Sequence, residues 1–295
     1  MVVQAVTSSA ATVALLAIAP TAHAQPPRTG ASPALAEASH ALSSGDTDRA
    51  LRLGTAYSRR HPQDVDAKVL LIRVHIDRGE WDRAYELASR AARAHPSNVD
   101  VLYYLGLVTR QLATQEFGRL MRIAPDSARV HQLRAETFEA QDRRADAEKE
   151  YAAALEANPD LLDALLGLAR LERIRLACEE AIGHYEKAET IRPTFAGAYG
   201  LGVCLSHLQN DEQAVRKFEQ AIQRSPSEAV GWAGLGTSLV RLRRTAEGIE
   251  KLQRAIALEP EMSEAHYMLG MAYQAAGDTA RAQAAFAKAQ ELRAR

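Results

Sequence analysis

The residues best able to do chemistry are two cysteines and two histidines that lie close together in the sequence. Two Cys and two His are a common ligand set for zinc. Cys204 and His207 are three residues apart and would share a helix face, whereas Cys178 and His184 are six apart and would point in different directions. This spacing argues against a metal site, so we predict neither a metal nor a cofactor.

The same cysteines raise the question of a disulfide. They are the only two in the chain, and an exported chain would meet an oxidising compartment in which Cys178 and Cys204 could pair. A disulfide needs the two Cα atoms within about 7 Å of each other, which the spacing alone does not show. The interpretation that we favour is a pair of small buried thiols.

Catalytic sequence motifs are absent. Gly234-Leu235-Gly236 begins like a dinucleotide-binding loop, but no strand pattern precedes it and the third glycine is missing. The sequence contains no H-E-x-x-H, G-x-S-x-G or P-loop motif. A net charge of −1 does not indicate a nucleic-acid-binding surface. We therefore predict that the chain is not an enzyme and binds no nucleic acid.

The elements that must position these residues recur along the chain. Seven of the eleven prolines follow one another at intervals of 34, 29, 34, 34, 33 and 34 residues. They are Pro62, Pro96, Pro125, Pro159, Pro193, Pro226 and Pro260. Each proline is expected to end a helix, because it lacks an N–H and disfavours the helical conformation of the residue before it. A fixed period of this length indicates a solenoid built from one stacked repeat.

The same residue types return at the same offsets in successive repeats. After Pro260, for example, the repeat contains Leu269, Gly270, Tyr273 and Phe286. Apolar residues at i, i+3, i+4 and i+7 predict two amphipathic helices in each repeat, and one such hairpin cannot bury its apolar face alone. The chain thus resembles the tetratricopeptide repeat family, whose 34-residue pattern is W-x2-L-G-x2-Y…A-x3-F…P.

The resemblance implies an all-α fold, a right-handed superhelical solenoid of antiparallel helix pairs over residues 34–295. Eight repeats begin near residues 31, 65, 99, 128, 162, 195, 229 and 263. The third is five residues short, and the loss falls between Arg110 and Ala113, where the internal turn should be. We predict two shortened helices there, with a tight, irregular turn near Leu112–Gln115. The alternative is a single long helix.

The first 24 residues contain no Asp, Glu, Lys or Arg. An apolar run over Ala10–Ala19 precedes Ala22-His23-Ala24, which is the pattern of a secretory signal peptide. The run is about half of the roughly 20 residues that a spanning helix needs. We expect cleavage after Ala24, export to the periplasm or the medium without stable membrane insertion, and a disordered leader over residues 25–33. An uncleaved anchor is the alternative.

The resemblance also implies a binding surface, the concave face that the first helices of the repeats line in this family. Ten residues stand at the positions concerned: Tyr103, Arg110, Leu166, Arg170, Arg173, Tyr199, Val203, Arg241, Tyr267 and Met271. Aromatic and arginine side chains are enriched at binding hot spots, and arginine can hold a carboxylate through two hydrogen bonds. We expect a protein or peptide partner with apolar and acidic side chains. For each residue, the alternative is an ordinary solvated face.

Our functional hypothesis is an exported interaction scaffold that binds an extended or helical segment and assists the assembly of an envelope complex. A regulatory or substrate-recruiting subunit of a separate enzyme, such as one acting on the cell wall, is the second hypothesis. A metal or redox module built on the Cys and His pairs is the third. Gln283 and Gln290 replace the apolar contact residues of earlier repeats, and a polar outer face on the last helix favours a monomer.

Overall fold

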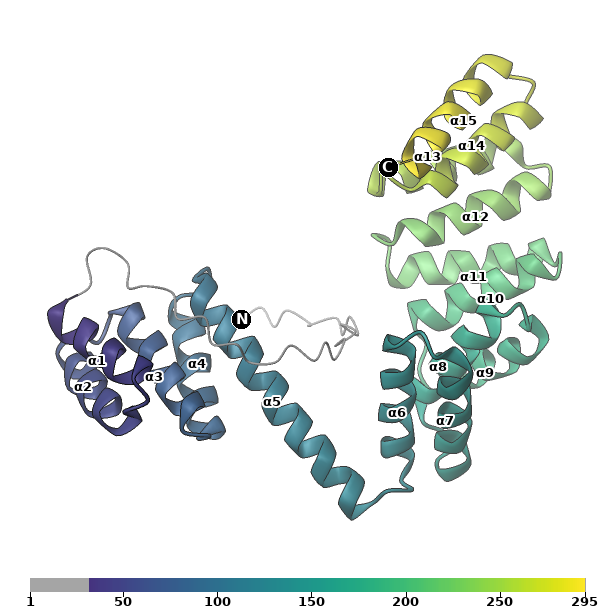
Figure 1. Ribbon diagram of the computed structural model, residues 1–295. Helices are drawn as coiled ribbons and strands as arrows, with labels where there is room; N and C mark the ends of the chain where they lie inside the picture. The colour runs from purple at the N-terminus through teal and green to yellow at the C-terminus, as the bar shows by residue number, and fades with distance from the viewer. Residues whose placement is uncertain (1–31, 295) are drawn as a thin grey trace. The chain divides into compact units, whose positions relative to one another are not determined.

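The computed structural model describes residues 32–294, which form helices α1 to α15 and contain no strand (Figure 1). The all-α fold with consecutive helix pairs is therefore confirmed. The described residues divide into two compact parts, an N-terminal part up to Pro125 and a C-terminal part from Asp126. The predicted signal peptide and most of the predicted leader lie outside the described residues. The leader was predicted to include Pro33, but α1 begins at that residue.

The helices follow one another as pairs, one pair for each repeat except the third. The N-terminal part contains α1 (Pro33–Ser43), α2 (Thr47–Arg60), α3 (Val65–Asp77), α4 (Trp81–Ala94) and α5 (Val99–Ile123). The C-terminal part begins with α6 (Ala128–Ala140), α7 (Arg144–Ala157), α8 (Leu162–Ile174), α9 (Cys178–Ile191) and α10 (Phe195–His207). It continues with α11 (Asp211–Arg224), α12 (Ala229–Arg241), α13 (Thr245–Leu258), α14 (Ser263–Ala275) and α15 (Thr279–Arg293).

Close packing of the two helices in a pair depends on small residues. A Cβ atom added to Gly202 of α10 would lie 2.8 Å from the ring of Phe218 in α11. At the equivalent Gly270, the added atom would lie 2.6 Å from Phe286. At Gly236 it would meet Leu252 at 2.7 Å. Glycine at this position therefore lets the second helix approach the first, and Gly236 serves this packing.

The third repeat differs from our prediction. The expected pair of short helices is wrong, because α5 is one continuous helix of 25 residues. The residues at the expected turn, from Gln111 to Gln115, include no Gly, Asn or Asp to stop a helix, and most are good helix formers. The Thr114 hydroxyl also donates to the carbonyl oxygen of Arg110 at 2.9 Å, within one helical turn. The five missing residues are those that would have reversed the chain.

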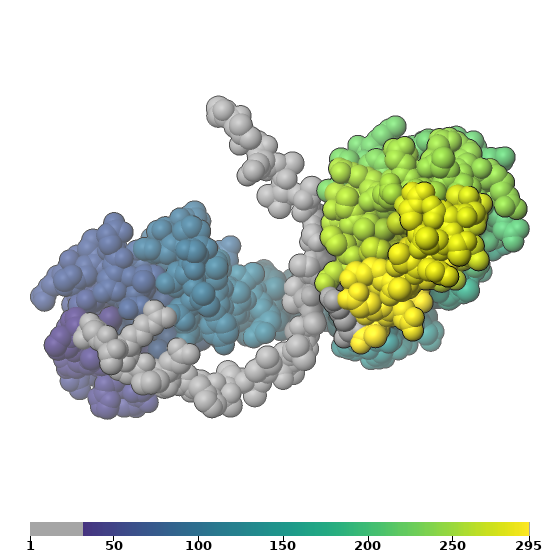
Figure 2. All heavy atoms as spheres, turned by 90° about the horizontal axis from the view of Figure 1, so that it is seen from above, coloured from purple at the N-terminus to yellow at the C-terminus, as the bar shows by residue number. Residues whose placement is uncertain are grey.

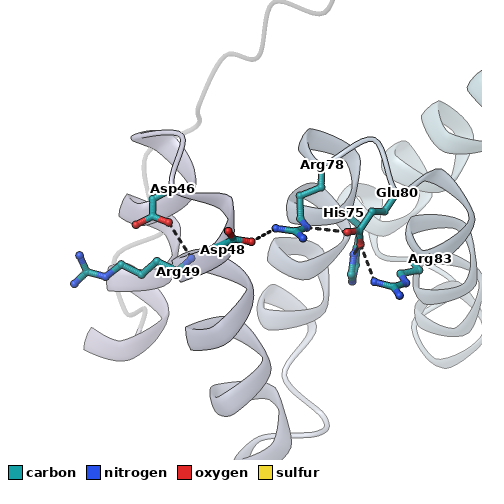
Figure 3. A network of polar contacts seen from close by, with 7 residues as sticks. All are labelled: Asp46, Asp48, Arg49, His75, Arg78, Glu80 and Arg83. Atoms are coloured by element: carbon teal, nitrogen blue, oxygen red, sulfur yellow. Dashed lines mark hydrogen bonds and ion pairs between the residues drawn. The ribbon is translucent and has the colours of Figure 1, made fainter.

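A polar network links the turns of the first two repeats (Figure 3). Arg78 donates to Asp48 at the start of α2 and, through Nε, to Glu80 Oε1 at 2.9 Å. Arg83 donates to Glu80 Oε2 at 3.2 Å, and His75 Nδ1 lies 2.8 Å from the same oxygen. These contacts lower the pKa of Glu80 from its usual 4.5 to about 2, and the hydrogen bond with Arg78 contributes most.

The depressed pKa of Glu80 makes the stability of this region depend on pH. A carboxyl whose pKa is lower in the folded state stabilises the fold above its unfolded pKa, and this contribution is lost as the pH falls. We expect Glu80→Gln to weaken hydrogen-exchange protection of α3 and α4 at pH 7, and the difference from wild type to shrink between pH 4.5 and about 2. The exposed Glu86→Gln is the control. Equal protection of E80Q and wild type at pH 7 would contradict this assignment.

The last helix lies at one end of the C-terminal part (Figure 2). Its buried side consists of small residues, Ala282, Ala285 and Ala289. Gln283 and Gln290 are exposed, as the sequence predicts. This polar face disfavours association through α15 and leaves the other surfaces of the chain free to associate.

Candidate functional site

The first helices of the later repeats form one layer. In the C-terminal part, α8 packs on α10, α10 on α12 and α12 on α14. Each second helix packs on the first helix of its own repeat and, up to α13, on that of the next repeat. Direct contact between successive first helices places them on the inner side of the curved stack. The inner side of such a stack is the extended concave surface on which repeat proteins bind their partners.

The predicted surface residues do not all lie in this layer. Tyr103 and Arg110 are exposed on α5 and belong to the N-terminal part. The ring of Tyr103 lies edge-on to that of Tyr104 at 5.1 Å. The other eight residues belong to the C-terminal part, on α8, α10, α12 and α14. The candidate site is therefore built from these eight.

Arg170 is engaged within the fold. Its Nη2 donates to Glu139 Oε2 at 2.7 Å, and the hydroxyl of Tyr151 donates to the same oxygen at 2.7 Å. Burial, and then the contact with Glu139, raise the pKa of Tyr151, so its hydroxyl remains a donor. The charge of Arg170 is thus already balanced by a carboxylate of α6.

Arg241 is engaged in a similar way. Its Nη1 donates to the carbonyl oxygen and to the hydroxyl of Ser206, each at 2.9 Å. The same nitrogen lies 3.7 Å from Asp211 Oδ1. These contacts tie α12 to the end of α10 and the start of α11. A partner's carboxylate would have to displace or share them.

Arg173 has different surroundings. Its Nε lies 3.4 Å from the hydroxyl of Tyr185, a long hydrogen bond, and its guanidinium carbon lies 5.9 Å from the centroid of the Tyr199 ring. Tyr199 in turn stacks on Phe195 with ring centroids 5.5 Å apart. Among residues 32–294, no carboxylate lies within ion-pair distance of Arg173. Burial raises the pKa of both tyrosines, so they stay neutral beside the guanidinium.

The apolar members fall into two groups. Leu166 and Val203 are half-buried and pack against the core of the stack. Tyr267 and Met271 are 40% and 41% exposed on α14. The ring centroids of Tyr267 and Phe286 are 5.5 Å apart, and the guanidinium carbon of Arg293 lies 5.3 Å from the centroid of the Tyr267 ring. The layer therefore offers apolar surface on both sides of α12.

The cysteine and histidine pairs form no metal site in the part of the chain that the structure describes. Cys178 and Cys204 are buried free thiols, and burial, followed by a hydrogen bond with Cys178, raises the pKa of Cys204. His184 Nδ1 lies 2.8 Å from Glu172 Oε2, and this contact raises the pKa of His184. These side chains serve the packing of the fifth and sixth repeats.

Two residues of the site were not predicted. Tyr185 stands at the aromatic position of the A-x3-F pattern, which indicates core packing, and Phe195 is the first residue of its helix. An open hollow of 690 Å³ lies elsewhere, at the turn between α14 and α15, where Tyr273, Asp278 and Arg281 are among its lining residues. None of the predicted surface residues lines it.

Comparison with known proteins identifies the family. Models described as tetratricopeptide repeats match residues 41–109, 133–194, 197–227 and 234–295. The chain belongs to the tetratricopeptide repeat family. Tetratricopeptide repeats are generally non-catalytic scaffolds, so the family supports a protein-interaction role. No curated protein sequence matches the chain.

Three solved structures show the same fold. YrrB, described as a TPR protein with an unusual peptide-binding site, is 19% identical with a TM-score of 0.51, and the match covers 60% of this chain and 91% of YrrB. MamA from Desulfovibrio magneticus RS-1 is 20% identical with a TM-score of 0.51, covering 56% and 94%. The APC/C hetero-tetramer Cut9-Hcn1 contains a chain that is 16% identical with a TM-score of 0.54, covering 83% and 50%. Within residues 32–294, no helix is long and apolar enough to span a membrane.

Proposed function

We propose that this protein is an exported scaffold that binds an extended or helical peptide segment on the inner layer of α8, α10, α12 and α14. The bound segment carries an acidic side chain for Arg173 and apolar side chains for the neighbouring rings. Binding of this kind requires no chemistry by the scaffold. It serves to hold a partner, and we propose the assembly of an envelope complex as its setting.

The surroundings of Arg173 carry this proposal. A guanidinium that is half-buried between aromatic rings and lacks a carboxylate partner gains more from an incoming carboxylate than one that is already paired. Arg170 and Arg241 hold internal partners, so they position the helices rather than the ligand. Tyr199 and Phe195 supply adjacent apolar area, of the residue types that dominate binding hot spots. The peptide-binding site by which YrrB is described is consistent with this use of the fold.

Export is proposed from the sequence alone. The apolar run over Ala10–Ala19 and the Ala22-His23-Ala24 motif support cleavage after Ala24. Amino-terminal sequencing of the protein purified from its natural host checks this: Gln25 as first residue supports export, and an intact Met1 contradicts it. A subunit that recruits a separate enzyme remains the second candidate, and it shares the same binding surface.

The peptide proposal is tested by selecting binders from a random peptide library against the protein. We expect the selected peptides to be enriched in Asp and Glu beside apolar residues. Replacing Arg173 with Met keeps the apolar stem but removes the charge, and we expect it to raise the dissociation constant of a selected peptide at least about tenfold. Fluorescence anisotropy with a labelled peptide measures the change.

A control variant and a check of folding make the test specific. Arg216→Met removes an exposed arginine from α11, a second helix, and is expected to leave the affinity unchanged. Circular dichroism establishes that both variants keep their helicity. Peptides that bind R173M as tightly as wild type would show that the inner layer near α8 is not the binding surface. The identity of the natural partner, a structural protein or an enzyme, then separates the two candidate functions.

A further inference from the structure

The third repeat retains both halves of a packing contact that its single helix cannot make. Gly106 is its eighth residue, the position held by Gly202 in the sixth repeat. Phe117 stands eight residues before Pro125, as Phe218 stands eight residues before Pro226. In the sixth repeat, the small residue and the ring lie on two antiparallel helices and meet. In the third repeat, both lie on α5.

Gly106 and Phe117, the two halves of this contact, are both uncovered in the structure. A Cβ atom added to Gly106 would meet nothing within 4 Å, whereas at Gly202 it would lie 2.8 Å from the Phe218 ring. The Phe117 side chain is 41% exposed, whereas Phe218 is 1% exposed. The other seven residues at the Gly106 position are all buried. The space beside Gly106 is therefore unfilled, and the Phe117 ring, of the residue type that fills this space in the sixth repeat, is uncovered.

Gly106 and Phe117 cannot fill each other within one chain while α5 is continuous. They are eleven residues apart on one rod, which separates them by about 16 Å along the helix axis at 1.5 Å per residue. The buried side of α5 also ends early: Leu112 is the last residue of α5 in the apolar cluster that this helix forms with α3 and α4. In Figure 1, the C-terminal half of α5 projects beyond α3 and α4.

The open positions form a continuous stripe. Residues spaced three or four apart share one helix face, and on α5 they are Leu102, Gly106, Thr109, Ala113, Phe117 and Leu120. None of them is buried. The stripe has small residues at its centre and large apolar residues at its ends, a shape that lets a second helix approach closely in the middle.

We propose that a second copy of this chain covers the stripe. The two α5 helices lie antiparallel about a two-fold axis near Leu112, and each Phe117 ring enters the hollow at Gly106 of the partner subunit. The same register places each Leu102 opposite Met121 of the partner subunit, and these two side chains are also exposed. The copies thereby exchange the second helix of the third repeat, which is the pattern of a domain-swapped dimer.

The loss of the turn favours this occupant over others. A shortened hinge that cannot reverse the chain is the standard route to exchange between protomers. The following repeat offers the Phe117 ring no small residue: Tyr151, Tyr185 and Phe218 each lie against a glycine of the next first helix, namely Gly167, Gly200 and Gly234. The residue at the same position after Phe117 is Leu133. The surface that fits the Phe117 ring in size and residue pattern is therefore the first half of a third repeat, which a second copy of the chain supplies.

The oligomeric state of the full chain tests the proposal. We expect light scattering coupled to size-exclusion chromatography to give twice the 32.2 kDa of one chain. Phe117→Glu places a charge in the contact and Gly106→Gln fills the hollow, so each is expected to raise the dimer dissociation constant at least about tenfold. Gln115→Glu, on the opposite side of α5, is the control and should remain dimeric. Because residues 106, 115 and 117 are exposed, all three variants should retain the helicity of wild type.

A further variant tests the exchange itself. Inserting five residues with a central Gly-Asn between Leu112 and Ala113 restores the 34-residue period, and we expect it to convert the dimer into a monomer. A wild-type chain that is monomeric at all concentrations, with fast hydrogen exchange at residues 111–115, would show that α5 breaks and folds back, and would overturn the proposal. A dimer that is unaffected by F117E and G106Q would overturn it as well, since its contact would lie elsewhere.

Discussion

Replacing Phe218 with alanine is expected to lower the free energy of unfolding by about 3–5 kcal/mol, the range found when a large buried aromatic side chain is removed. The ring is 1% exposed and lies where Cβ atoms at Gly202 and Gly234 would meet it at 2.8 Å and 2.5 Å. It therefore fills the space between α10, α11 and α12. Removing it leaves a cavity that two glycines cannot close, because they have no side chains to move into it.

The effect should be local as well as large. Stability in a stacked array is a sum of repeat and nearest-neighbour contributions, so hydrogen exchange should accelerate first in α10 to α12. Denaturant unfolding measures the total loss. The control is Tyr267→Ala, which removes an aromatic ring that is 40% exposed and is expected to cost far less. A loss below about 1 kcal/mol for F218A would contradict a close-packed ring at this position.

The sequence predicted the regular repeats well because their packing is local. Gly202 and Phe218 are sixteen residues apart and contact each other whenever the turn between them forms. Proline at a fixed offset then ends the second helix. Since every contact of this kind falls within one repeat or between neighbours, its register can be read from the 34-residue period without knowing the overall fold.

The third repeat shows the limit of that reasoning. We predicted a turn near Leu112–Gln115 because Phe117, Leu120 and Ile123 are out of phase with the apolar stripe in the first half of the repeat. Register, however, reports which face a helix buries and does not show whether the chain can reverse. The residues between Arg110 and Phe117 favour helix, and nothing local opposes their continuation. Local propensity therefore decided the structure of α5, and the apolar face remained open.

The site was predicted only in part, for a related reason. The positions of Arg170 and Arg241 on first helices were predicted, but their partners Glu139 and Asp211 come from other helices. Whether such side chains meet depends on rotamers and on the rise between repeats, which a sequence pattern does not specify. Arg173 could not be distinguished from Arg170 by position, and only the structure shows that its neighbours are rings rather than carboxylates.

The helices of the seventh repeat are so close that even one methyl group should be harmful there. A Cβ atom at Gly236 of α12 would lie 2.7 Å from Leu252 Cγ and 2.9 Å from the carbonyl oxygen of Gly248 in α13. A flexible side chain could move aside, but the backbone oxygen could do so only if the two helices separated. We therefore expect Gly236→Ala to lower the free energy of unfolding by about 1–3 kcal/mol, the usual cost of overpacking.

The same substitution at Gly183 should have the opposite sign. Gly183 lies within α9, is exposed, and has nothing within 4 Å of an added Cβ atom. Alanine there gains up to about 1 kcal/mol of helix propensity over glycine, and no clash opposes it. Urea unfolding of wild type, G236A and G183A measures both changes in one protein. If both variants were stabilised, helix propensity would outweigh the close approach of α12 and α13, and the role assigned to Gly236 would be wrong.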